Sequence, residues 1–95
     1  MTFPKSFRMA GNRWKVVITK RRASEYGSCD AATHTIRINT LVGDEYVSEQ
    51  TMLKTFLHEW WHAYEATTGR TYSETDAVQF EEMMYQTLST MKGVA

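Results

Sequence analysis

The sequence predicts an α+β domain in which a small antiparallel or mixed sheet is followed by two helices. Before residue 40, aromatic and β-branched side chains cluster and alternate with polar ones, as in strands. After residue 50, apolar residues recur every three or four positions, which is the period of a helix. The 95 residues, of which 42% are hydrophobic and 23% charged, are enough for one modest core. We therefore expect residues 1–95 to form a single domain.

The first half contains two segments with the composition of strands. Residues 14–19 are rich in aromatic and β-branched side chains, and the three positive charges at residues 20–22 are expected to end this strand. Residues 33–39 alternate between apolar and polar side chains, which places Ile36 and Ile38 on one face.

The segments around these strands are less regular. Residues 3–12 are expected to be an extended lead-in, and residues 25–30 fit either a short strand or a loop. A hairpin turn is expected at residues 30–32, just before the second strand.

Two amphipathic helices are predicted in the second half. The first has its apolar side chains on one face, at Leu53, Phe56, Leu57, Trp60, Trp61 and Tyr64. Ser48 is its expected N-cap, and Gly69 is the glycine expected to end it. The second helix is expected to begin at about Ser73, with an apolar stripe formed by Ala77, Phe80, Met84, Leu88 and Met91.

The first predicted helix carries the motif His58-Glu59-Trp60-Trp61-His62, an H-E-x-x-H. Histidines four positions apart lie one above the other on a helix, so both imidazoles can bind a single metal ion. Glu59 is rotated by about 100° from His58 and therefore lies beside the metal rather than on it. From there it can take a proton from a zinc-bound water. The motif predicts zinc-dependent hydrolysis of peptide bonds, with His58 and His62 as metal ligands and Glu59 as the catalytic base.

A catalytic zinc site needs a third protein ligand and an open fourth position. The best-placed candidates are the carboxylates Glu74 and Asp76, at the start of the second predicted helix. Glu74 has the longer reach, and Asp76 could instead close a capping box with Ser73. We therefore favour Glu74 and keep Asp76 as the alternative, with His34 as a further candidate on the predicted strand.

The H-E-x-x-H motif, followed by Glu-Thr-Asp-Ala-Val-Gln-Phe at residues 74–80, resembles short gluzincin-type metallopeptidase domains. These include the ImmA/IrrE-like family and small metallopeptidases encoded by phages and prophages. The similarity extends from about Pro4 to Leu88. It implies a zincin-like core whose third zinc ligand is Glu74 in one alignment with the family pattern and Asp76 in the other. It also implies that the strand from Thr35 to Asn39 is the sheet edge along which a protein or peptide substrate lies by strand addition.

An alternative function is a non-catalytic metal-binding module that acts through protein–protein interaction, with zinc as a structural staple. This alternative requires Cys29 or His34 to close the coordination shell. A lone cysteine is otherwise a small buried hydrophobe. For the hydrolase, Tyr64, Tyr72 and Tyr85 are candidate hydrogen-bond donors to the oxyanion of the reaction.

The composition speaks against several other classes of protein. Eleven Lys and Arg balance eleven Asp and Glu, so a nucleic-acid partner is not expected, although residues 20–22 could contact phosphate. The single cysteine excludes an internal disulfide. We expect neither a signal peptide nor a membrane span, because no apolar run approaches about 18 residues, and hence a cytoplasmic protein.

Overall fold

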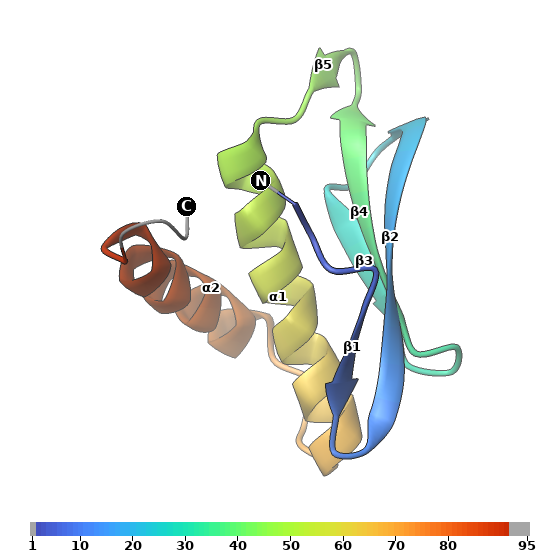
Figure 1. Ribbon diagram of the computed structural model, residues 1–95, viewed down its shortest axis with the longest axis vertical. Helices are drawn as coiled ribbons and strands as arrows, with labels where there is room; N and C mark the ends of the chain where they lie inside the picture. Colours follow the sequence, from blue (N-terminus) through green and yellow to red (C-terminus); the bar gives the residue numbers. More distant parts are fainter. Residues whose placement is uncertain (1, 92–95) are drawn as a thin grey trace.

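The computed structural model describes residues 2–91 and has the predicted α+β order, a mixed sheet followed by two helices. The strands are β1 (Ser6–Met9), β2 (Asn12–Ala23), β3 (Gly27–Asp30), β4 (Thr35–Val42) and β5 (Glu45–Tyr46). The helices are α1 (Glu49–Thr68) and α2 (Glu74–Ser89). Figure 1 shows α1 lying along one face of the sheet, with α2 on the far side of α1. No helix among the described residues is long and apolar enough to cross a membrane.

β4 lies inside the sheet, so the expectation that the strand from Thr35 to Asn39 forms its edge is wrong. The strand order is β1-β2-β4-β3, and β5 pairs with the end of β4. β4 runs parallel to β2 and antiparallel to β3, which it joins through the turn that follows Asp30. Alternation identifies a strand but not its neighbours. The edge position belongs to β3, the hairpin partner of β4.

β2 is longer than expected, because residues 20–22 continue the strand instead of ending it. Its pairing with β4 shifts register between Thr19 and Arg22 and then resumes. An irregularity of this kind bends the strand and keeps it in the sheet while its charged side chains stay exposed. β1, which falls in the segment expected only to be extended, pairs antiparallel with β2.

The core lies between the sheet and α1. Its buried residues come from β2, β4 and α1, and they are Trp14, Val16, Ile36, Ile38 and Ala63. Ile36 and Ile38 are fully buried on one face, as their alternation predicts. α2 packs on the other side of α1, where the ring of Phe80 lies 5.3 Å from that of Trp60 and 5.0 Å from that of Trp61.

The predicted helix signals are found in the structure. Ser48 Oγ accepts the backbone N–H of Thr51, and Ser73 Oγ accepts that of Asp76, so both serines are N-caps. Gly69 follows α1 with φ of 74°, in the left-handed region that favours glycine. α2 ends at Ser89, so Met91 lies beyond the helix instead of on its apolar stripe. The N-cap at Ser73 makes Glu74 the first residue of α2.

Candidate metal centre

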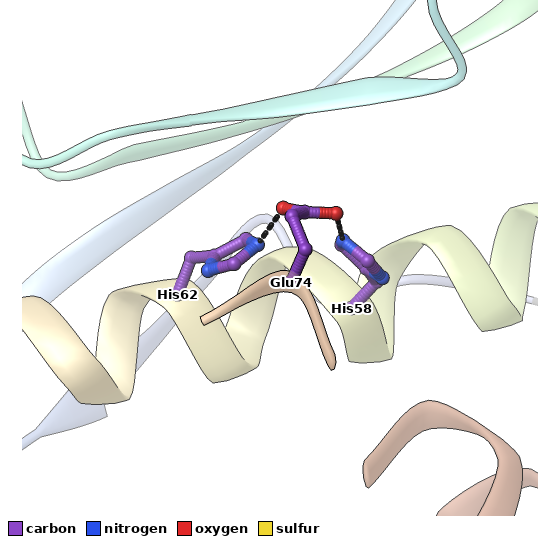
Figure 2. A group of neighbouring side chains, drawn as sticks. All are labelled: His58, His62 and Glu74. Atoms are coloured by element: carbon purple, nitrogen blue, oxygen red, sulfur yellow. Dashed lines mark hydrogen bonds and ion pairs between the residues drawn. The ribbon is translucent and has the colours of Figure 1, made fainter. Parts of the chain in front are cut away.

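Three side chains that the sequence singles out come together between α1 and the start of α2. The donor atoms of His58, His62 and Glu74 all lie within 4.8 Å of one another. Glu74 Oε2 is 3.1 Å from His58 Nε2, and Glu74 Oε1 is 2.7 Å from His62 Nε2 (Figure 2). A tetrahedral zinc ion with bonds of about 2.0–2.2 Å spans donors about 3.4 Å apart. The group is therefore close enough to hold a metal ion.

The other candidate ligands lie elsewhere. Asp76 is exposed, and it lines a separate cavity together with Trp61 and Phe80. The ring of His34 stacks on that of Trp14, with centroids 4.7 Å apart. Within residues 2–91, neither of these side chains joins the donor group, and Glu74 is the carboxylate that reaches the histidines.

Each histidine of the group is held at its other ring nitrogen by a glutamate. His58 Nδ1 lies 2.8 Å from Glu81 Oε1, and His62 Nδ1 lies 2.6 Å from Glu65 Oε1. Carboxylates in this position fix the tautomer and the orientation of the ring and leave Nε2 for a metal. Glu65 is only 3% exposed, and its second oxygen accepts the Ser73 N–H at 2.9 Å. Glu65 therefore positions both His62 and the start of α2.

Glu81 is a functional candidate that no motif identifies. It lies 23 residues from His58 in the sequence and reaches the site only because α2 packs on α1. Ala77, which is fully buried, lies one turn before it at the helix contact. The signal that could have revealed Glu81 is its spacing from Glu74. Glu74, Ala77 and Glu81 lie at i, i+3 and i+7 and therefore share one face of the helix.

The charge balance of the site favours a cation. When Nδ1 donates to a glutamate, a neutral imidazole directs the lone pair of its Nε2 at the Glu74 carboxylate. These two groups repel unless a proton or a metal ion lies between them. Burial alone would lower the pKa of His58, but the hydrogen bond to Glu81 and the charges of the surrounding glutamates together raise it. A divalent cation at Nε2 would neutralise much of this negative charge.

Glu59 lies beside the donor group, where the helical rotation predicts it. Together with His58, His62 and Glu74 it lines a cavity of about 460 Å³, whose opposite wall is β3. A second cavity of about 310 Å³ borders Glu59 on the side toward Tyr26. Burial raises the pKa of Glu59 above its ordinary value, against the lowering effect of the two histidines. A carboxylate with a raised pKa is a stronger general base near neutral pH.

Of the three candidate tyrosines, Tyr72 is the one that lines this cavity, and Tyr64 and Tyr85 lie outside it. Its ring stacks on His62 with centroids 4.2 Å apart, and its hydroxyl donates to Glu74. That hydrogen bond raises the pKa of Tyr72 to about 12 and lowers the pKa of Glu74. The phenol therefore keeps its proton at neutral pH and remains a donor.

Cys29 lines the cavity without joining the donor group. Burial, reinforced by the charge of Glu59, raises the pKa of its thiol to about 12. Among the described residues, the donor group consists of His58, His62 and Glu74, and Cys29 lies outside it. This geometry favours an open fourth position over one closed by Cys29.

Comparison of the chain with protein-family models, with curated proteins and with solved structures finds no match. What the site does is therefore inferred from its own residues.

Proposed function

We propose that this chain is a zinc-dependent peptide-bond hydrolase of the gluzincin type, with zinc held by His58, His62 and Glu74. One observation carries the proposal: these donors meet in a cavity that also holds Glu59. Two histidines and a glutamate are a ligand set of catalytic zinc sites, which keep their fourth position open. Zinc bound there would polarise a carbonyl oxygen and lower the pKa of a bound water.

The side chains around the donors would divide the work of hydrolysis. Glu59, whose pKa is raised by burial, accepts a proton from the attacking water and passes it to the leaving amine. Tyr72 keeps its proton, and its hydroxyl would turn from Glu74 to donate its one hydrogen bond to the oxyanion that forms on the carbonyl oxygen. Glu65 and Glu81 hold the two imidazoles in the orientation that the ligands need.

A peptide substrate would lie along β3, which takes the edge position expected of the strand from Thr35 to Asn39. β3 is the last strand in the sheet order, and its residues Gly27, Ser28 and Cys29 line the cavity. The outer backbone N–H and C=O groups of an edge strand can pair with an extended peptide. The cavities on the two sides of Glu59 would then receive substrate side chains.

The proposal is tested by measuring zinc content and cleavage of an unfolded protein in parallel. Glu59→Gln is expected to retain zinc and to abolish cleavage, whereas Glu74→Ala is expected to lose both. Glu82→Gln is the matched control, because Glu82 is an exposed carboxylate on α2 that pairs with Lys54. Zinc without cleavage in the unaltered chain would favour the non-catalytic metal-binding module. Absence of zinc after reconstitution would refute both functions.

A further inference from the structure

The zero net charge of the chain is the sum of two halves of opposite sign. Residues 1–48 carry eight Lys and Arg against four Asp and Glu, whereas residues 49–95 carry three against seven. The first half contains the whole sheet, and the second contains both helices. The acidic surplus includes the glutamates around the metal centre. The positive surplus therefore lies on the sheet.

Four basic side chains of the sheet point away from the helices. Trp14 and Ile36 are buried toward α1, so their neighbours Arg13, Lys15 and Arg37 project from the opposite side. Figure 1 shows both helices on one side of the sheet, and no helix or strand of residues 2–91 covers the other side. We call this uncovered side the open face, and strand alternation places the exposed basic residues Arg8, Arg13, Lys15 and Arg37 on it.

Strand pairing joins these residues into one strip. Arg8 lies directly opposite Arg13, and Lys15 follows on the same strand about 6.7 Å further along. Arg37 lies opposite Val17, the next residue on that face of β2. In the described part of the chain, no ion pair joins these four basic side chains to a carboxylate. Neighbouring like charges on a sheet repel each other, and an anion lying over the strip would relieve that repulsion.

The strip ends in a hollow of about 460 Å³ on the same face. Arg21 and Arg37 line it together with the hydroxyl-bearing residues Ser24 and Ser28, and Glu25 is the carboxylate at its border. Guanidinium groups match the geometry of phosphate, and serine hydroxyls are common partners of phosphate oxygens. The hollow therefore extends the strip with groups suited to a phosphate.

We propose that the open face binds nucleic acid through its phosphate backbone. The face supplies positive charge and hydroxyls without the exposed apolar anchors that a protein partner uses. The large apolar side chains that are exposed among residues 2–91 lie elsewhere, and they are Ile18, Tyr26, Tyr46, Tyr72, Val78, Met83 and Met91. Binding through phosphates predicts steep salt dependence and little sequence preference.

The test is fluorescence anisotropy of the full chain with a labelled single strand of about 20 nucleotides. Binding is expected with a Kd of about micromolar order at about 50 mM salt and to weaken steeply by about 200 mM. The double variant Arg13→Gln/Arg37→Gln is expected to bind about 10-fold more weakly or worse. Its log–log salt slope is expected to shrink by about 1.4, since each lost contact to a single strand removes about 0.7.

The charge-matched control is Lys54→Gln/Arg70→Gln, which removes two positive charges from the helical half and is expected to bind like the unaltered chain. Thermal unfolding and zinc content show whether each variant is folded. Three results would overturn the proposal: no binding at about 50 mM salt, equal loss in both double variants, or tighter binding to a polyglutamate peptide of matched charge. Glu59→Gln is expected to bind normally, so this outcome is independent of the proposed hydrolysis.

Discussion

Glu65 and Glu81 each form a hydrogen bond with Nδ1 of a histidine, but the two glutamates differ in burial and in their other partners. The Glu65 side chain is 3% exposed, and it also accepts the backbone N–H of Ser73. The Glu81 side chain is 17% exposed, and its bond to His58 is its link to the site. Replacing Glu65 would also leave the partly buried backbone N–H of Ser73 without its partner, which costs up to about 1–3 kcal/mol. A substitution of Glu81 is therefore expected to change the affinity for the metal with less effect on the stability of the fold than a substitution of Glu65.

Glu81→Gln is expected to weaken zinc binding about 10–100-fold, because an amide orients the His58 ring less firmly and adds no negative charge. Competition with a chromogenic chelator measures this change in Kd. Glu82→Gln alters the neighbouring residue, whose partner is Lys54 at 3.2 Å on the surface, and is expected to leave the Kd unchanged. Equal affinity in the two variants would show that Glu81 does not position the ligand.

Cys29 is expected to be unreactive in the folded, metal-free chain. Its pKa of about 12 leaves very little thiolate at pH 8, whereas an unfolded chain has the ordinary cysteine pKa of about 8.5. The rate of reaction with a disulfide reagent should therefore rise by about three orders of magnitude in denaturant. Glu59→Gln should also accelerate the reaction, because the charge of Glu59 contributes to the raised pKa. Equal rates in folded and unfolded chains would contradict this view of the cavity.

At the scale of elements, the contact between β3 and α1 depends on a residue without a side chain. A Cβ on Gly27 would lie 2.5 Å from Thr55 Cγ2, 2.7 Å from the Arg37 carbonyl oxygen and 3.4 Å from Glu59 Cγ. A larger residue would thus push the edge strand away from the helix that carries the proposed catalytic base, Glu59. Gly27 thus allows β3, the strand along which the substrate is proposed to lie, to come close to Glu59.

Gly27→Ala is expected to lower the free energy of unfolding by about 1–3 kcal/mol, the usual cost of overpacking. Urea unfolding measures the change, and Ser28→Ala on the exposed side of the same strand is the control. Adding Thr55→Ser should restore only part of the loss, because the Arg37 oxygen belongs to the backbone and cannot be removed. Unchanged stability in Gly27→Ala would mean that β3 moves freely relative to α1.

The elements that sequence could predict are those specified by neighbouring residues. The caps at Ser48 and Ser73 and the glycine after α1 depend on hydrogen bonds within one turn, so their residue types are sufficient. The order of the strands depends on pairings between distant segments, and alternation does not encode these. This is why alternation correctly predicts the strand from Thr35 to Asn39, whereas the prediction that this strand forms the sheet edge is wrong.

At the scale of the whole molecule, the part of the candidate metal centre that lies within one helix is predictable from the sequence, whereas the part that depends on contacts between helices is not. His58, Glu59 and His62 lie within five consecutive residues, so one helix places them. The choice between Glu74 and Asp76 requires the distance between two helices, and finding Glu81 requires their packing. The basic open face could not be predicted from the net charge, because a total charge contains no information about where the charges lie.

Zinc is expected to stabilise the whole fold, because its proposed donors come from both helices. At a free zinc concentration of about 100 times Kd, the free energy of unfolding should rise by about 2.7 kcal/mol. Glu74→Gln should abolish this increment at little cost to the metal-free chain, since the Glu74 side chain is 58% exposed. Urea unfolding with and without a chelator measures both effects. An equal increment in Glu74→Gln would place the third donor elsewhere.

The position of α2, packed on α1 away from the sheet, also sets how the molecule opens. A helix attached on one side can detach as a separate cooperative unit while the sheet and α1 stay folded. Such an event would carry Glu74 and Glu81 away together and leave Glu59 and both histidines in place. Amide hydrogens of α2 should then exchange faster than those of α1 in the metal-free chain, and a bound ion should reduce the difference. The lifetime of a bound ion would be limited by how often this hairpin of helices comes apart.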